Sequence, residues 1–259
     1  TLHFSEADLD FLQAQHFHPA FIDYLRAFRF RGTIYSVKEG EVVFPNCPLV
    51  RVEGNQFEAQ LVETLLLNML NFQSLIATKA SRMRWVAGER VLSDFGLRRA
   101  QGLGGVQASR AAIIGGFNST SNVYAALLYQ LEASGTMAHS FVQSFDSELE
   151  AFRAFANARP DQCVFLVDTY DTLRSGVPHA IKVAKEMEQQ GHRAIGLRLD
   201  SGDLAWLAKA SRNMLDEAGL HYMKIVASNQ LDEYVIRSLL EQKAPIDIFG
   251  VGTRLVTGS

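Results

Sequence analysis

Short apolar runs alternate with amphipathic helical stretches over the second two thirds of the chain. In the clearest case, Ala194–Leu207, an apolar run breaks at Arg198 and Asp200, turns, and restarts with apolar residues at helical spacing. The same order of strand, polar turn and helix recurs after three other apolar runs, at 164–167, 225–227 and 246–249. We therefore expect a series of strand and helix units, with polar residues gathered where the strands end.

Strands that alternate with helices form parallel sheets, whose strands are covered on both faces. The polar strand ends are about 24 to 32 residues apart, which is enough for one strand, one helix and two loops. This spacing favours an α/β fold in the form of a (β/α) barrel, with its site at the carboxyl ends of the strands. An open doubly wound sheet is the alternative.

The first 90 residues follow a different pattern. Ser5 and Asp8 form a variant capping box, and Pro19 suits the first position of a second helix, so two short helices are expected. Strand-like runs (R-G-T-I-Y-S-V, E-V-V-F and L-V-R-V-E-G) predict a small β module within 28–54. Residues 57–86 lack Gly and Pro and predict one long helix, with a break near Asn71 as the alternative. We expect residues 1–90 to hold these elements and residues 91–259 to hold the barrel.

The barrel part is too short for eight units. Residues 91–259 number 169, whereas a complete eight-unit barrel takes roughly 250. We therefore expect an incomplete barrel, truncated at its carboxyl-terminal end, beside a smaller β-rich domain. Because the sequence begins at Thr1 and stops soon after a strand, we also expect an internal piece of a longer protein.

Composition argues against several kinds of partner and compartment. The formal net charge is −3, the pI is about 6.2 and blocks of like charge are absent, so nucleic acid is not expected as a partner. Apolar runs such as 65–67 are soon interrupted by Asn68 and Asn71, so no bilayer span of roughly 18 residues is expected. Two cysteines, Cys47 and Cys163, indicate neither a disulfide framework nor a zinc site and are typical of a cytoplasmic protein.

Chemically active side chains recur at the predicted strand ends. Phe95 ends one strand and precedes Arg98; an aromatic face can hold a flat ring, and a guanidinium group binds carboxylate or phosphate. From this pattern alone, a plain core role for Phe95 is an equal alternative. His139 follows a predicted short strand, and in isolation a structural role is favoured for it. Asp168 at another strand end changes this interpretation, because its carboxylate would accept one imidazole N–H, fix the tautomer and raise the nucleophilicity of the ring.

Gly252 and Thr253 close the series of strand ends. In the run G-V-G-T, small residues let backbone N–H groups face an anion, and Thr253 adds a hydroxyl. Barrels often bind phosphate in their last loops, so phosphate is expected here. A tight turn chosen only for its backbone angles is the alternative.

Seven segments in order along the chain carry a specific pattern. They are D-F-G-L-R-R-A-Q-G (94–102), G-G-F-N-S-T-S-N-V (115–123), S-G-T-M-A-H-S (134–140), V-D-T-Y-D (167–171), L-R-L-D-S-G-D (197–203), A-S-N-Q-L-D-E (227–233) and G-V-G-T-R-L (250–255). Together with residues 61–80, they resemble the nicotinate phosphoribosyltransferase family over most of the chain.

The resemblance implies a type II phosphoribosyltransferase, a homodimer with shared active sites. Its reaction would join nicotinate to 5-phosphoribosyl diphosphate, giving nicotinate mononucleotide and diphosphate in NAD biosynthesis, coupled to hydrolysis of ATP. Mg²⁺ would be held mainly by diphosphate and water, so no dedicated metal ligands of the protein are expected.

On the base side, motif position implies that Phe95 stacks on the pyridine ring and that Arg98 holds a carboxylate or phosphate. Ser140 would line the nicotinate pocket, and Arg198 would contact the base. Related nicotinamide-using enzymes carry an aspartate at the position that aligns with Ser121, where it would repel the carboxylate of nicotinate. Ser121 removes that repulsion.

On the sugar and phosphate side, the resemblance implies that ATP transiently phosphorylates His139 and that Asp168 orients it. Asp200 would contact the ribose hydroxyls and oppose the positive charge that forms on the sugar as diphosphate leaves. Gly252 and Thr253 would hold the 5-phosphate.

Three alternatives stay open at this point. A nicotinamide phosphoribosyltransferase is disfavoured by Ser121. A non-catalytic nucleotide-binding barrel is disfavoured by the presence of both His139 and Asp168, which a mere binder does not need. A metal-dependent barrel hydrolase would want several His or carboxylate ligands at strand ends, and only His139 qualifies clearly.

Overall fold

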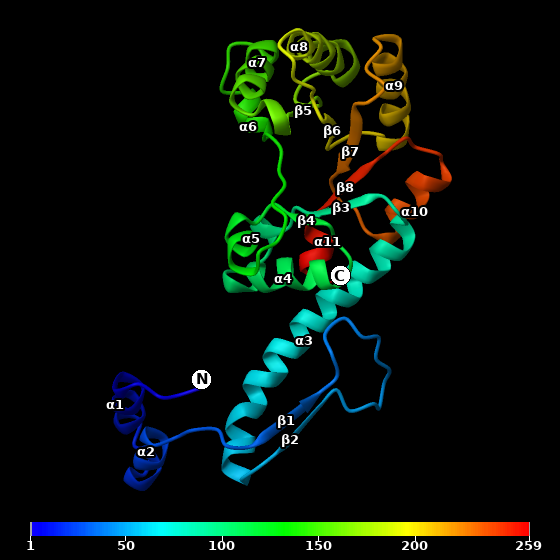
Figure 1. Ribbon diagram of the computed structural model, residues 1–259. Coiled ribbons are helices and arrows are strands. Elements are labelled where there is room, and N and C mark those ends of the chain that lie inside the picture. The colour runs from blue at the N-terminus through cyan, green and yellow to red at the C-terminus, as the bar shows by residue number, and fades with distance from the viewer. Residues whose placement is uncertain (1, 259) are drawn as a thin grey trace. The chain divides into compact units, whose positions relative to one another are not determined.

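The computed structural model describes residues 2–258 (Figure 1). The chain divides into two compact units, Thr1–Asn71 and Phe72–Ser259. The long helix α3 (Gln56–Ala87) begins in the first unit and ends in the second. It is continuous, with no break at Asn71. The division into compact units falls inside this helix.

The first unit opens with helices α1 (Glu6–Ala14) and α2 (Pro19–Arg26), which confirms both predicted helices. Ser5 and Asp8 form the capping box at α1: the Ser5 amide donates to the Asp8 carboxylate at 2.8 Å, and the Asp8 amide donates to the Ser5 hydroxyl at 3.3 Å. Pro19 stands at the first position of α2, where its missing N–H costs no helical hydrogen bond. The buried Leu9, Ile22 and Leu25 form the core of this unit.

The β module of the first unit is smaller than the sequence suggests. Strands β1 (Thr33–Ser36) and β2 (Val50–Glu53) form an antiparallel pair. The predicted strand at 41–44 is wrong: this run lies in the connection between β1 and β2, and Val42 and Phe44 are 84% and 68% exposed. Pro45 follows it directly and has no N–H to donate to a ladder. Apolar residues alone do not make a strand without a partner to pair with.

The second unit is built on one parallel sheet. Its strands are β3 (Val91–Asp94), β4 (Ser119–Thr120), β5 (Val164–Leu166), β6 (Gly196–Leu199), β7 (Lys224–Ser228) and β8 (Ile248–Val251). Their order is β4-β3-β8-β7-β6-β5, and every recorded pairing among them is parallel. The predicted α/β class with a parallel sheet is confirmed. The first strand of the unit, β3, pairs with the last, β8, with Leu92 opposite Phe249.

Helices follow most of these strands, as the alternating pattern predicts. They are α4 (Leu103–Ile114), α5 (Val123–Tyr129), α6 (His139–Val142), α7 (Glu148–Ala158), α8 (Val177–Gln189), α9 (Leu204–Glu217), α10 (Glu233–Glu241) and α11 (Thr253–Val256). Short helical turns are η1 (Leu97–Arg99), η2 (Pro160–Gln162) and the π-helical η3 (Thr172–Gly176). Figure 1 shows α8 and α9 covering strands β5 to β7. The strand residues Phe165, Leu197, Ile225 and Phe249 are fully buried, so the sheet forms the core.

Helix α3 is the one described helix that is long and apolar enough, by length and composition alone, to cross a bilayer. No such segment is expected from the sequence, where Asn68 and Asn71 interrupt the apolar runs. The most apolar 18-residue window of α3 is 11% buried. In the carboxyl-terminal half of the helix, Ile76, Ala80 and Met83 are fully buried in the core of the second unit.

Candidate active site

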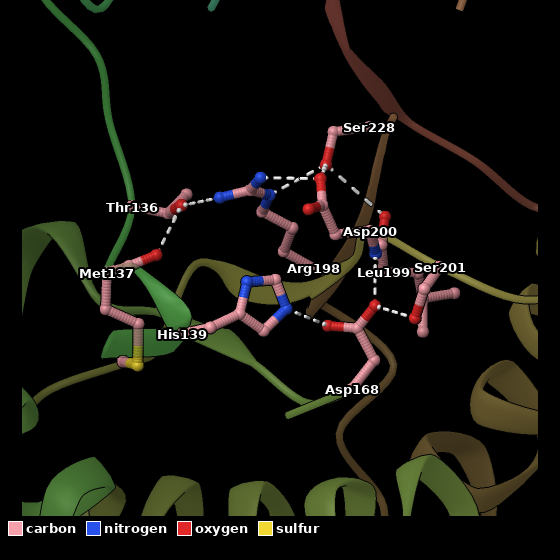
Figure 2. Close-up of polar contacts among 9 residues, drawn as sticks. All are labelled: Thr136, Met137, His139, Asp168, Arg198, Leu199, Asp200, Ser201 and Ser228. Carbon is pink, nitrogen blue, oxygen red and sulfur yellow. Dashed lines mark hydrogen bonds and ion pairs between the residues drawn. The ribbon is translucent and has the colours of Figure 1, made fainter. Parts of the chain in front are cut away.

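Polar side chains meet at one edge of the parallel sheet, as the strand-end pattern predicts. Asp168 lies two residues beyond β5, Asp200 directly follows β6, and Ser228 is the last residue of β7. Because parallel strands end at the same edge, these three residues become neighbours despite wide separation along the chain. Figure 2 shows them around His139 and Arg198.

His139 contacts Asp168 directly. The imidazole Nε2 lies 3.1 Å from Oδ1 of the carboxylate, whose side chain is only 2% exposed, while the His139 side chain is 39% exposed. The other carboxylate oxygen accepts hydrogen bonds from the Asp200 amide at 2.7 Å and the Ser201 hydroxyl at 2.6 Å (Figure 2). Asp168 is therefore held on both oxygens, and it holds one ring nitrogen of an imidazole whose other nitrogen is free for chemistry.

Arg198 is the second polar centre of the site. Its guanidinium group donates to Asp200 at 2.6 Å, to the Ser228 hydroxyl at 2.7 Å and to the Thr136 hydroxyl at 2.8 Å. Ser228 also donates to the Asp200 carboxylate. The Arg198 and Asp200 side chains are 12% and 20% exposed. Partial burial and the fork geometry make this pair rigid, since both groups are fixed by more than one hydrogen bond.

Phe95 joins the site through its aromatic ring. The Arg198 Cζ atom lies 5.4 Å from the ring centroid, within the range of a cation–π contact. Gly250 in β8 makes room for this ring, because a Cβ atom at that position would lie 2.5 Å from two Phe95 carbons. The Phe95 amide donates to the Val251 carbonyl at 2.8 Å, which brings the start of the Gly252 turn beside it.

The remaining predicted residues are close to members of this set along the chain. Arg98 is exposed in η1, three residues after Phe95. Ser121 follows β4 and donates its amide to the Asp94 carbonyl at 2.8 Å. Ser140 follows His139 in α6, and Thr253 opens α11 directly after Gly252.

Three contributors were not singled out from the sequence: Thr136, Ser201 and Ser228. Each lies in a segment that the pattern identifies as a strand end or turn. Hydroxyl residues are common in turns, so their presence there does not by itself indicate a role in the site. The available signal was their position at or beside strand ends. The segment before His139 also differs from expectation, because it contains an isolated bridge between Ala133 and Thr120 and no strand.

A cavity of about 190 Å³ borders the site. Its wall includes Phe95, Thr136 and a ring of three hydroxyls, from Ser93, Ser119 and Ser134. The three hydroxyl oxygens lie 2.7 to 3.0 Å from one another, so each can donate and accept once within the ring. The cavity therefore offers an aromatic face and a small polar wall to a flat ligand, and Arg198 lies against the same aromatic ring.

Within residues 2–258, no group of three or more His, Cys, Asp or Glu side chains is arranged to hold a metal ion. A ligand such as diphosphate would have to supply most of the oxygen atoms that coordinate a cation at this site.

The fold and the site together define an α/β protein with a candidate active centre at the carboxyl ends of a parallel sheet. A sequence model of the nicotinate phosphoribosyltransferase (NAPRTase) N-terminal domain matches residues 1–71, and one of the NAPRTase family matches residues 91–258. The chain belongs to the nicotinate phosphoribosyltransferase family.

Individual relatives agree with this assignment. A nicotinate phosphoribosyltransferase of Bacillus subtilis (strain 168) is 53% identical over 98% of this chain and 52% of its own length. One of Mycobacterium tuberculosis (strain H37Rv) is 48% identical over 98% of this chain and 54% of its own. The crystal structure of human nicotinic acid phosphoribosyltransferase superposes with a TM-score of 0.90 at 34% identity, covering 96% of this chain and 62% of that one. The chain spans about half the length of the curated relatives it matches.

Proposed function

We propose that the protein joins nicotinate to 5-phosphoribosyl diphosphate, forming nicotinate mononucleotide and diphosphate for NAD biosynthesis, with ATP hydrolysis coupled to the reaction. The observation that carries the proposal is the contact between His139 and Asp168 beside the Arg198–Asp200 pair and Phe95, in a chain of this family. The names of the relatives support the same reaction.

The scaffold for this reaction would be an incomplete (β/α) barrel, in a chain that also carries a smaller, β-containing amino-terminal domain. The strand order supports it, because β4-β3-β8-β7-β6-β5, read as a circle, follows the order of the strands along the chain, as in a barrel, whereas a doubly wound sheet reverses direction at its centre. The sheet order ends at β4 and β5, so the barrel would be open between these two strands.

The base would bind against Phe95. Its ring and the nearby Arg198 guanidinium offer a stacking face and a positive charge to a pyridine carboxylate. Ser121 and Ser140 would line the pocket with neutral hydroxyls. Arg98, exposed at the rim, would bind the carboxylate or a phosphate group of the substrates.

The sugar would lie beside Asp200. As the C1–O bond to diphosphate breaks and the C1–N bond to the base forms, positive charge develops on the ribose, and a nearby carboxylate stabilises it. Arg198 fixes the Asp200 carboxylate by a 2.6 Å hydrogen bond, which favours a single orientation. Gly252 and Thr253 would accept the 5-phosphate through backbone amides and a hydroxyl.

The coupling to ATP would use His139. With its Nε2 proton donated to Asp168, Nδ1 carries the lone pair that would attack the γ-phosphorus; an N–P bond forms, the P–O bond breaks and ADP leaves. The phosphorylated imidazole would add negative charge beside the substrates and help to align Mg²⁺ and diphosphate. Diphosphate and water would supply most ligands of Mg²⁺.

Two further properties complete the proposal. The protein would act in the cytoplasm as a homodimer whose active sites are shared between subunits. Sedimentation velocity of the full chain, with and without 5-phosphoribosyl diphosphate, tests the dimer.

The activity itself is tested by incubating the full chain with nicotinate and 5-phosphoribosyl diphosphate, with and without ATP, and measuring mononucleotide by chromatography. We expect product in both cases and more with ATP. Acid-labile phosphate should appear on the chain with ATP and be absent from His139→Asn. Absence of product contradicts the proposed enzymatic activity and favours a nucleotide-binding role. A preference for nicotinamide as substrate favours the alternative of a nicotinamide phosphoribosyltransferase.

A further inference from the structure

Asp94, the last residue of β3, is a fully buried carboxylate to which the proposed reaction gives no role. Its Oδ1 accepts a hydrogen bond from the Gly96 amide at 2.8 Å. Its Oδ2 accepts from the Ser109 and Thr120 hydroxyls, both at 2.8 Å. These three donors are neutral, and they come from three different segments of the chain. A buried carboxylate placed in this way ties those segments to one another.

One of the segments is the turn that carries Phe95. The bond from Gly96 to the Asp94 side chain closes an Asx turn across Phe95, which fixes the direction in which the ring leaves the sheet. Gly96 is itself confined, because a Cβ atom there would lie 2.1 Å from a methyl carbon of Val256. The turn can therefore shift only if its neighbours also shift.

A second segment carries Ser121. The Ser121 amide donates to the Asp94 carbonyl at 2.8 Å, while the preceding Thr120 donates its hydroxyl to the Asp94 side chain. The Thr120 hydroxyl in turn accepts from the Asn122 amide at 3.0 Å. Hydrogen bonds anchored on Asp94 thus bracket Ser121 on both sides.

We propose that Asp94 is a positioning residue for the base-binding half of the site. It holds Phe95 and Ser121 at a fixed separation and does not touch the base itself. This inference rests on the proposed function. It predicts that loosening Asp94 changes recognition of the base more than recognition of 5-phosphoribosyl diphosphate.

Asp94→Asn tests this directly, because the amide keeps the shape but offers a donor where Oδ2 now accepts two hydroxyl protons. We expect the KM for nicotinate to rise about tenfold and the KM for 5-phosphoribosyl diphosphate to stay within about twofold. A purely structural role would instead lower the yield or melting temperature of the folded protein and leave both KM values unchanged.

Thr120→Val and Ser109→Ala form a matched pair, since each removes one hydroxyl that donates to the same Oδ2 and accepts from Asn122. Thr120 adjoins Ser121, whereas Ser109 lies in α4. We expect Thr120→Val to raise the KM for nicotinate by about threefold or more and Ser109→Ala to change it by less than about twofold. If Asp94→Asn does not fold, the comparison of these two variants still tests the positioning role of Asp94.

An unchanged KM for nicotinate in Asp94→Asn, or equal effects of Thr120→Val and Ser109→Ala, would overturn the positioning role while the activity of the unmodified chain stands. Failure of the unmodified chain to make mononucleotide overturns the proposed function itself.

Discussion

Asp168 presents one oxygen to His139 at 3.1 Å and its other oxygen to the Asp200 amide at 2.7 Å. Among the hydrogen bonds drawn in Figure 2, only those of the Asp168 carboxylate connect the imidazole to the strand end that carries Asp200. The Asp168 side chain is 2% exposed and the His139 side chain 39% exposed, so the carboxylate lies inside and the imidazole nearer the surface.

Asp168→Asn should lower turnover by on the order of 100-fold or more, because the amide can donate to the imidazole and favour the wrong tautomer. Steady-state formation of mononucleotide with ATP measures the effect. Ser201→Ala is the matched control: it removes one donor to Asp168 but leaves the Asp200 amide, and it should cost less than about tenfold. Equal losses in the two variants would contradict the special role of the His139 contact.

Ser121→Asp should weaken the use of nicotinate relative to nicotinamide. Two carboxylates at contact distance repel by about 1 to 4 kcal/mol, which corresponds to about fivefold to several-hundredfold in kcat/KM. Competition between the two bases, followed by product analysis, measures the ratio. Ser121→Asn controls for size without charge and should shift the ratio less. An unchanged ratio in Ser121→Asp would refute the assignment of Ser121 to the base pocket.

Gly176→Ala should destabilise the second unit and reduce activity. A Cβ atom at Gly176 would lie 1.9 Å from the Val167 carbonyl oxygen, directly before Asp168. Overpacking of this kind costs about 1 to 3 kcal/mol of unfolding free energy, measured by urea denaturation. Gly104→Ala is the control, because the nearest atom to its added Cβ, on Phe72, is 4.0 Å away. Gly104→Ala should therefore not destabilise the chain.

The pair between Arg153 in α7 and Glu186 in α8 should give a pH-dependent contribution to stability. Two hydrogen bonds of 2.8 and 2.6 Å from Arg153 lower the pKa of the Glu186 carboxyl. Because the folded pKa is below the unfolded one, the contribution is present above the unfolded pKa and is lost as the pH falls through the folded value. Glu186→Gln should lower Tm by only about 1 to 3 °C at pH 7, since the pair is partly exposed. The difference in Tm should vanish in acid; a difference that persists at pH 2 would contradict this origin.

The two cysteines should differ in reactivity. Burial raises the pKa of the Cys163 thiol to about 12, whereas Cys47 is exposed. A chromogenic disulfide reagent at pH 8 should therefore modify one thiol per native chain and a second only after denaturation. Rapid modification of two thiols in the native chain would show that the segment leading into β5 opens easily.

Much of the second unit follows from its sequence pattern, because a buried parallel strand and an amphipathic helix each leave a strong signal. The runs that lead into Asp168, Asp200 and Ser228 form strands in the structure, and Asp171 caps the helical turn that follows it. The run at 41–44 fails because strand formation depends on a partner that local pattern does not specify.

Part of the candidate site can also be predicted from the sequence. The shared edge of parallel strands predicts that His139 and Asp168 meet. They lie within hydrogen-bonding distance, although the segment before His139 holds an isolated bridge and no strand. The partners Thr136, Ser201 and Ser228 depend on side-chain directions that a sequence does not reveal. The role proposed for Asp94 cannot be predicted from the sequence either, because it depends on three hydrogen-bond donors that the fold brings together from separate segments.

The pairing of β3 with β8 has a consequence for how the chain matures. During synthesis β3 emerges early, but its partner at Ile248 arrives only near the end of this sequence, so one side of β3 stays without backbone partners. Contacts between such distant segments slow folding, and uncovered strand edges invite association between nascent chains. A ribosome-bound or prematurely terminated product that stops before β8 should consequently need chaperone protection.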